Sequence, residues 1–299
     1  MNLDKFLGCI FGVAIGDTQL TLATIDALTE SDGIFDMDAI ARAHIRAYKG
    51  ERRGWGRSTR KACERLTKGA KWNWTNSGDR DGAGNGVMMK IAPLGLWQTM
   101  AVEDIRPFVN KCIEYGKMTH LGTPAIVAGT LHAVSIATFA GRKDSFVRVP
   151  TFLSYLYELA KGLEAELPPW KDKISSQIIN IMAYIDYGRR GNLGKQSPED
   201  IASLFGGGTS YAYHSFGLAY AIFAKSACNP DNPDPFNAVF EAVNAGGDTD
   251  TNASIVGSLV GALHGMRAIP QELVEGVEKS GEIRERTEKF FEACKRRAK

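Results

Sequence analysis

Two aspartates and a threonine follow a pair of glycines in the last third of the chain. Asp248, Asp250 and Thr251 come directly after Gly246 and Gly247, and an apolar run of helical composition follows them. Glycine pairs let the backbone turn tightly, so we expect the three side chains to face one point at the start of a helix. Carboxylate and hydroxyl oxygens suit Mg²⁺, Ca²⁺ or Mn²⁺ better than Zn²⁺. The spacing therefore predicts a site for a divalent cation.

A purely structural role at the helix start is the alternative for this stretch. Asp and Thr are preferred N-cap residues, because their side-chain oxygens accept hydrogen bonds from the first free N–H groups of a helix. One cap explains one aspartate, but hardly both Asp248 and Asp250 behind two glycines. Metal binding is therefore the favoured interpretation of the motif.

A second glycine-rich stretch, Gly84, Asn85 and Gly86, ends a polar loop over residues 69–86 and precedes an apolar run. Such a loop can present backbone N–H groups to phosphate, and a plain turn fits the spacing equally well. It is not a dinucleotide fingerprint, because the G-x-G-x-x-G spacing is absent and no strand precedes it. His120 stands between two expected helices, and on spacing alone it is a structural histidine.

Helical patterns cover most of the chain, and no convincing alternating strand pattern occurs. Helices are expected over 3–16, 39–48, 61–66, 102–117, 125–140, 150–187 with a break at Pro168-Pro169, 212–226, 236–243 and 253–265. The segment 189–210 is expected to be a polar connection, and its three glycines lack the Gly-Lys-Ser/Thr of a phosphate loop. The sequence predicts an all-α fold with one domain over residues 1–299, because neither a composition boundary nor a fixed repeat is visible.

Glycines recur in steps of four on two of the expected helices. They are Gly8, Gly12 and Gly16 on the first helix, and Gly257, Gly261 and Gly265 on the helix after Asp250. Residues four apart share one helix face, and glycines there allow two backbones to approach closely. The pattern predicts close packing of both helices, with Asp17 as a partner for the Asp248 site.

The bulk composition is that of an ordinary soluble protein, with 44% apolar and 23% charged residues among 299 and a formal charge of +2. No basic stripe predicts a nucleic-acid partner. Lys5 and the apolar run after it imitate a signal peptide, but the run is too short to span a bilayer, so we expect a buried helix and no membrane partner. Five scattered cysteines indicate reduced thiols and a cytoplasmic protein. A monomer is the simplest expectation.

Together these pieces resemble the ADP-ribosylglycohydrolase family, which includes the dinitrogenase reductase-activating glycohydrolase and the ADP-ribosyl-acceptor hydrolases. The resemblance is carried by Gly246-Gly247-Asp248-Thr249-Asp250-Thr251, by Gly84-Asn85-Gly86 with Met89 and Pro93-Leu94-Gly95, and by Thr119-His120. It implies a single compact, orthogonal all-α domain with two Mg²⁺ or Mn²⁺ ions at the base of a cleft. It also implies hydrolysis of the bond between ADP-ribose and a modified side chain.

Residue by residue, the resemblance implies three sets of roles. Asp248, Asp250 and Thr251 match metal ligands; Gly84, Asn85 and Gly86 match the loop that holds the ribose and diphosphate; and His120 matches a histidine near the substrate in some members.

The chain departs from the family pattern after the first helix. Family members carry Gly-Asp there, then a long loop, then Thr-Asp-Asp-Thr at the start of the next helix, whereas here Gly16-Asp17 runs straight into Thr18-Gln19. Asp17 can replace only one of the two aspartates of that motif, as a metal ligand or as the carboxylate that takes the proton of the attacking water. Alternatively, it is the aspartate of the Gly-Asp at the end of the first helix. Three interpretations stay open: the ligand set is incomplete and activity weak or absent, Asp17 suffices for a one-metal site, or a segment of the gene product is missing from this sequence.

The leading hypothesis is a metal-dependent hydrolase that removes ADP-ribose from a modified protein or a small-molecule conjugate, with Asp17 and Asp248 as its catalytic candidates. One alternative is a degenerate member that binds ADP-ribose without turnover. A second is a metal-dependent hydrolase of another nucleotide-sugar or N-glycoside.

Overall fold

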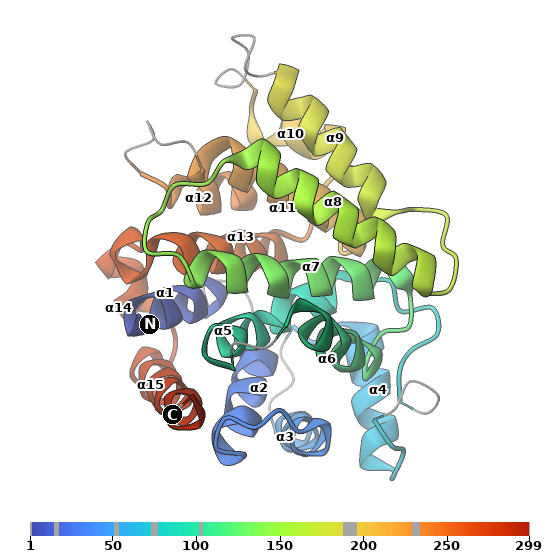
Figure 1. Ribbon diagram of the computed structural model, residues 1–299, viewed down its shortest axis with the longest axis vertical. Coiled ribbons are helices and arrows are strands. Elements are labelled where there is room, and N and C mark those ends of the chain that lie inside the picture. The colour runs from blue at the N-terminus through green and yellow to red at the C-terminus, as the bar shows by residue number, and fades with distance from the viewer. Residues whose placement is uncertain are drawn as a thin grey trace.

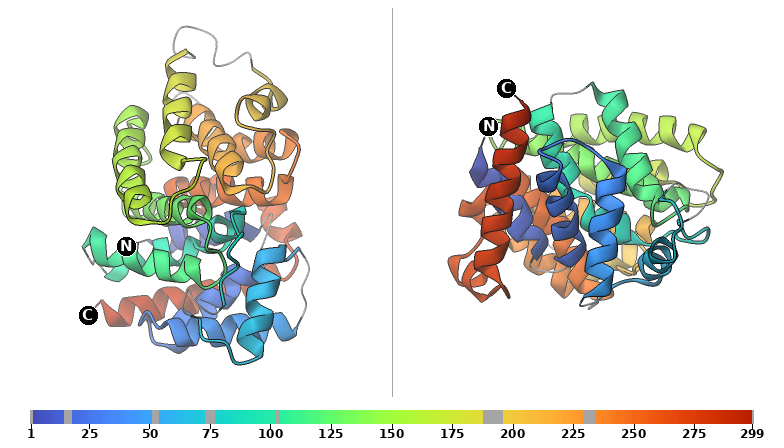
Figure 2. Two further views of the ribbon diagram at one scale, coloured as in Figure 1. Left: turned by 90° about the vertical axis from the view of Figure 1, so that its right-hand side faces the viewer. Right: turned by 90° about the horizontal axis from the view of Figure 1, so that it is seen from below.

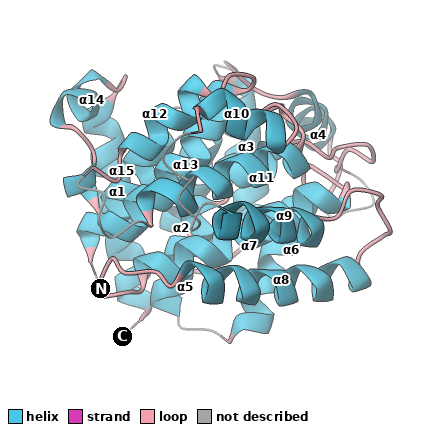
Figure 3. Ribbon diagram, turned by 90° about the horizontal axis from the view of Figure 1, so that it is seen from above, coloured by secondary structure: helices cyan, strands magenta, loops and turns pink. Residues whose placement is uncertain are grey.

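Helices form the regular structure of the computed structural model (Figure 1), which describes residues 2–14, 18–50, 54–72, 77–101, 104–187, 196–228 and 234–298. No strand occurs within these ranges, where Figure 3 shows helices and loops alone. Two isolated bridges, Asp79 with His120 and Gly84 with Tyr211, are the β-type pairings among the described residues. The predicted all-α fold is confirmed.

The helices follow one another in this order: α1 (Leu3–Ala14), α2 (Gln19–Glu30), α3 (Met37–Lys49), α4 (Arg57–Thr67), the 3-10 helix η1 (Asn85–Lys90), α5 (Ala92–Ala101), α6 (Ile105–Lys117), α7 (Thr123–Ala140), α8 (Val149–Glu166), α9 (Ile174–Tyr187), α10 (Pro198–Leu204), α11 (Ala212–Ile222), the π-helix η4 (Phe223–Ala227), α12 (Asn237–Asn244), α13 (Thr249–His264), the 3-10 helix η5 (Met266–Ala268), α14 (Gln271–Gly276) and α15 (Ser280–Arg297).

Helices α7 and α13 form the centre of the molecule. These two helices contact each other. Helices α8 and α9 lie on one side of the pair, and α2, α3 and α15 lie on the other side (Figure 1). Helix α15 returns to lie along α1 and α2, so the first and last helices share one side of the fold (Figure 2). By length and composition α7 could span a membrane, but 83% of its apolar window is buried inside the protein. It is the core helix of this fold.

Helices α1 and α13 cross with their backbones in direct contact. A Cβ built on Gly12 would lie 2.0 Å from the Gly257 carbonyl oxygen, and one on Gly261 would lie 2.0 Å from the Gly8 carbonyl oxygen. No side chain larger than hydrogen fits at such distances. The predicted close approach of the two glycine-bearing helices is confirmed. The third glycine of the first helix, Gly16, lies outside the described residues.

The N-terminal apolar segment is a buried helix, as predicted. Residues 5–13 are all buried, and the Lys5 ammonium donates hydrogen bonds of 2.9 Å to the carbonyl oxygens of Phe139 and Arg142. All five cysteines are buried, as expected of core residues, and no two of them form a disulfide.

The predicted polar connection over 189–210 is partly wrong, because it contains α10. This helix begins with a capping box: Ser197 Oγ accepts a hydrogen bond from the Asp200 N–H at 3.2 Å, and the Asp200 carboxylate accepts one from the Ser197 N–H at 3.1 Å. Within α10 only Ile201 and Ala202 are buried. So short a helix therefore leaves little apolar periodicity in the sequence.

Candidate active site

A tight turn positions Asp248 immediately before α13. Gly246 and Gly247 have φ angles of 77° and 75°, in the left-handed region that favours glycine. Gly247 also has no room for a side chain, since a Cβ there would lie 2.5 Å from the Gly208 carbonyl oxygen. That oxygen accepts hydrogen bonds from the Asp248 N–H at 2.8 Å and from the Asn252 side-chain amide at 2.9 Å. The turn is therefore fixed against Gly208.

The Asp248 side chain makes no capping hydrogen bond, although Asp248 occupies the N-cap position of α13. Its Oδ2 atom instead accepts a hydrogen bond of 2.7 Å from Asn85 Nδ2, a residue 163 positions earlier. Asn85 is buried, and its Nδ2 also donates to Ser215 Oγ at 2.9 Å. Helix capping therefore does not explain the Asp248 carboxylate. The two polar stretches identified in the sequence meet at this contact.

Negative charge accumulates at this point. Burial raises the pKa of the Asp248 carboxyl above its ordinary value, and the hydrogen bond from Asn85 opposes that shift. The neighbouring Asp250 carboxyl raises the pKa further, because adjacent negative charges disfavour ionisation. Among the described residues, no Lys or Arg lies within ion-pair distance of either carboxylate. A bound cation would neutralise this pair.

The donor atoms at this site are all oxygens. Asp250 Oδ1 accepts a hydrogen bond of 2.8 Å from the N–H of the buried Thr251, which keeps the two residues together on the first turn of α13. Over the described part of the chain, no group of three His, Cys, Asp or Glu side chains could hold a metal. The predicted ligand Asp17 lies outside the described residues. Two carboxylates and a hydroxyl fit Mg²⁺ or Mn²⁺.

The loop of Gly84, Asn85 and Gly86 is fixed from two directions. The Asn85 N–H donates to the Ser210 carbonyl oxygen at 2.9 Å, and a Cβ on Gly86 would lie 3.0 Å from His120 Cε1. His120 therefore packs directly on the loop. The backbone N–H of Asn85 already has a partner, so phosphate binding by this loop would rest on the N–H groups of Gly84 and Gly86.

A buried lysine sets the hydrogen-bonding direction at His120. Lys90 Nζ donates to Thr119 Oγ1 at 2.7 Å, and His120 Nδ1 lies 2.8 Å from the same oxygen. The Thr119 hydroxyl has two acceptors, His120 Nδ1 and the Gly116 carbonyl oxygen at 3.5 Å, and the shorter contact favours donation to Nδ1. Burial lowers the pKa of His120 to about 3. The ring is therefore neutral and carries its proton on Nε2, on the side that faces Gly84.

The stability of the protein is expected to depend on the titration of Lys90. Burial lowers its pKa from 10.5 to about 7, and no described carboxylate pairs with it. Below pH 7 the folded and unfolded chains both bind the proton, and the folded chain bears the full cost of a buried charge. Above pH 7 the folded chain releases the proton first, so the free energy of unfolding rises with pH, by on the order of 1 kcal/mol per pH unit.

Urea denaturation of the wild type and of Lys90→Met between pH 7 and about 8.5 measures this effect. The window ends below 9.0, the ordinary pKa of a cysteine thiol, because the buried Cys63 lies near Lys90. The rise is expected in the wild type and is much smaller in Lys90→Met, where the buried histidines still contribute near pH 7. Lys143→Met, at an exposed position, keeps the full rise. An equal slope in Lys90→Met and the wild type would contradict a buried, readily deprotonated Lys90.

Three residues that hold the site in place were not predicted from the sequence to have this role. Gly208 holds the Asp248 turn, Ser215 fixes the Asn85 side chain, and Lys90 orients His120. The sequence carries a signal for two of them. Gly208 ends a run of three glycines, all with positive φ in the structure, and Lys90 is the single lysine of an apolar run before a proline.

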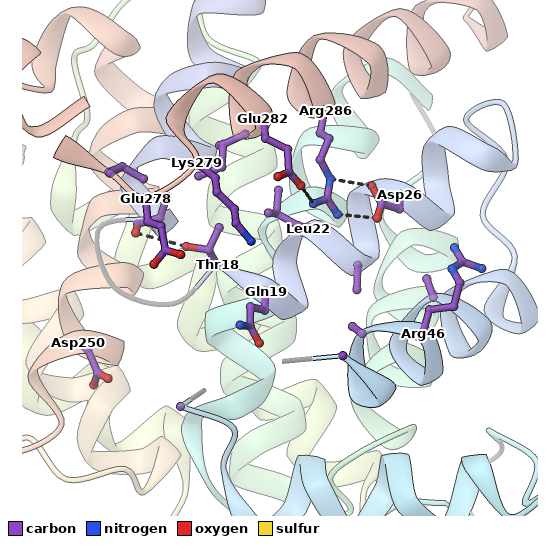
Figure 4. A pocket seen from close by; sticks show the side chains of 18 residues that line it. Thr18, Gln19, Leu22, Asp26, Arg46, Asp250, Glu278, Lys279, Glu282 and Arg286 are labelled. Atoms are coloured by element: carbon purple, nitrogen blue, oxygen red, sulfur yellow. Dashed lines mark hydrogen bonds and ion pairs between the residues drawn. The ribbon is translucent and has the colours of Figure 1, made fainter. Parts of the chain in front are cut away.

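Asp250 also lines a cavity of about 610 Å³ (Figure 4). The cavity walls come from the start of α2, the end of α3 and the residues from Val277 to Arg286. Asn85, Asp248 and His120 are not among its lining residues. The carboxylate pair therefore separates the glycine loop from this cavity.

Comparisons with known proteins identify the family of this chain. A family model described as ADP-ribosylglycohydrolase matches residues 16–299. ADP-ribosylhydrolase ARH3 of Mus musculus is 24% identical over 303 residues, which cover 92% of this chain and 77% of the mouse protein. The uncharacterized protein YegU of Escherichia coli (strain K12) is 24% identical over 286 residues, which cover 91% of this chain and 80% of YegU.

A solved structure described as an ADP-ribosylglycohydrolase-related protein complex matches with a TM-score of 0.67 and 22% identity, over 99% of both chains, and so shares the fold. The chain belongs to the ADP-ribosylglycohydrolase family. It is therefore a member of a family of hydrolases that act on ADP-ribose conjugates.

Proposed function

We propose that this protein is a metal-dependent hydrolase that releases ADP-ribose from a modified protein side chain or from a small-molecule conjugate. The observation that carries the proposal is the 2.7 Å hydrogen bond between Asn85 and Asp248, because it joins the loop expected to bind the nucleotide to the carboxylates expected to bind the metal. Family membership supplies the class of reaction.

Asp248, Asp250 and Thr251 would hold Mg²⁺ or Mn²⁺, as two ions or as one. When bound, a divalent cation supplies positive charge that orients the ribose hydroxyls and makes a water molecule more acidic. Asp17 stays the predicted further ligand and proton acceptor, in a stretch outside the described residues.

The other residues bind and orient the substrate. The backbone N–H groups of Gly84 and Gly86 would bind the diphosphate. The Nε2–H of His120 points to this face of the loop and would donate a hydrogen bond to a substrate oxygen. Asn85 positions the Asp248 carboxylate and does not itself bind substrate through its side-chain N–H groups, which are committed to Asp248 and Ser215.

Binding of ADP-ribose without turnover is a second candidate, and the short α1–α2 junction favours it. Helix α1 ends at Ala14 and α2 begins at Gln19, so the long loop and the full Thr-Asp-Asp-Thr motif have no place between them. Gln19 is not acidic, and its Oε1 atom accepts a hydrogen bond of 2.8 Å from Trp55 Nε1.

Incubation with mono-ADP-ribosylated protein, followed by mass-spectrometric identification of the released nucleotide, tests the proposal. A hydrolase is expected to release intact ADP-ribose. A pure binding protein would show measurable affinity for free ADP-ribose but no release. Cleavage of another nucleotide-sugar or N-glycoside, with none of the ADP-ribosylated protein, would favour a metal-dependent hydrolase of those compounds.

A further inference from the structure

The cavity beside Asp250 has the dimensions of a ligand site. Its volume of about 610 Å³ lies within the range of about 300–1,000 Å³ for small-molecule pockets. Apolar side chains form much of its wall, from Leu22 and Ala23 on α2, Ala47 on α3, and Val277 and Ile283 near the C-terminus. A site of this kind binds a partly apolar group.

Two of the three cations on the cavity wall are already paired. Arg286 forms hydrogen-bonded ion pairs with Asp26 on α2 and with Glu282 on its own helix. Arg46 makes two hydrogen bonds of 2.7 Å to the Glu30 carboxylate. Among the described residues, these pairs leave no unpaired cation on the α2 and α3 sides of the cavity.

Lys279 is the exception among the described residues of the wall. Its side chain extends into the cavity in Figure 4, while the Glu278 carboxylate points toward Thr18. No described carboxylate lies within ion-pair distance of the Lys279 ammonium. Lys279 also has a φ of 61°, a left-handed backbone that costs a lysine about 1 kcal/mol or more. An unpaired cation in a strained position beside a cavity indicates a ligand with negative charge.

The position of the cavity relative to the carboxylates indicates which part of a substrate would enter it. If the nucleotide lies on the glycine loop, its diphosphate is on the Asn85 side of Asp248. The glycosidic bond then lies at the carboxylate pair, and the group on the far side of that bond extends past Asp250. Asp250 lines the cavity, so this group, the acceptor that loses ADP-ribose, enters there.

We propose that the cavity binds the peptide segment that carries the ADP-ribosylated side chain, and that Lys279 pairs with an acidic residue next to the modified one. This inference rests on the proposed function and adds a substrate class to it. The cavity holds more than one side chain, and its apolar wall would bind the aliphatic part of the modified residue. The preferred substrate is thus an ADP-ribosylated acidic peptide.

The test uses two mono-ADP-ribosylated peptides that differ only in having Glu or Lys beside the modified residue. For Lys279→Glu, the KM of the acidic peptide is expected to rise about fivefold or more and that of the basic peptide to fall. The Kd of free ADP-ribose, measured by calorimetry, stays unchanged because the nucleotide side is intact. Lys143→Glu, an exposed lysine away from the cavity, serves as the matched control.

A second variant and a binding measurement separate this proposal from the proposed function. Ala47→Trp fills the cavity from the end of α3 and is expected to weaken both peptides without changing the Kd of ADP-ribose. If the wild type cleaves neither peptide, calorimetric binding of the intact peptides still decides the inference: a preference for the acidic peptide that Lys279→Glu reverses supports it. Equal effects of Lys279→Glu on both peptides, in KM or in Kd, would overturn it.

Discussion

Replacing Asp248 by asparagine is expected to lower the rate of ADP-ribose release by a factor of about 10³, which corresponds to several kcal/mol of lost electrostatic stabilisation. The substitution keeps an oxygen that can accept the hydrogen bond from Asn85, so the turn and the fold should be retained. It removes one of the two negative charges that would hold a divalent cation. Affinity for Mg²⁺ should fall together with the rate.

Asp104→Asn is the matched control for this change. Asp104 is also the N-cap residue of an α-helix, α6, and like Asp248 it makes no side-chain capping hydrogen bond. Its substitution should leave the rate of release and the Mg²⁺ affinity unchanged. An Asp248→Asn protein with full metal affinity and full activity would show that the carboxylate pair is not the metal site.

The second large effect is expected on stability, at the crossing of α1 and α13. In Gly12→Ala the new Cβ would lie 2.0 Å from the Gly257 carbonyl oxygen, so the two backbones must separate. Overpacking of this kind costs about 3 kcal/mol or more, which lowers the melting temperature by roughly 5 °C or more for a protein of 299 residues. Because α13 carries Asp250 and Thr251, activity should fall as well.

Gly281→Ala is the control for the crossing. Gly281 lies in the first turn of α15, where an added Cβ meets nothing within 4 Å, and alanine favours a helix more than glycine does. Thermal unfolding should show an unchanged or slightly higher melting temperature. If Gly12→Ala behaved in the same way, the close backbone contact between α1 and α13 would be refuted.

The helix crossing was predictable because its cause is local. Glycines four residues apart mark one face of a helix, and two such faces, at Gly8 and Gly12 and at Gly257 and Gly261, have few ways to pack other than against each other. The α10 helix was not predictable in the same way, because its start depends on a reciprocal hydrogen bond between Ser197 and Asp200 rather than on apolar periodicity.

The candidate site was predictable in its parts but not in its assembly. The residue types around Asp248 indicated metal binding through oxygen atoms. Asn85 lies 163 positions away in the sequence, and no local pattern indicated that it would donate a hydrogen bond to Asp248. The orientation of His120 depends on Lys90 and Thr119, and only three-dimensional packing brings that lysine to that hydroxyl. The left-handed backbone of Lys279 likewise leaves no signal in the sequence.

Metal dependence of catalysis is measured as ADP-ribose release from mono-ADP-ribosylated protein, first with Mg²⁺ and then with a chelator, using protein whose intact mass matches these 299 residues. We expect release with Mg²⁺ that stops in the chelator and returns when Mg²⁺ is restored. Release that continues unchanged in the chelator would contradict the metal-dependent mechanism. No release under either condition would contradict the hydrolase and favour a protein that binds ADP-ribose without cleaving it.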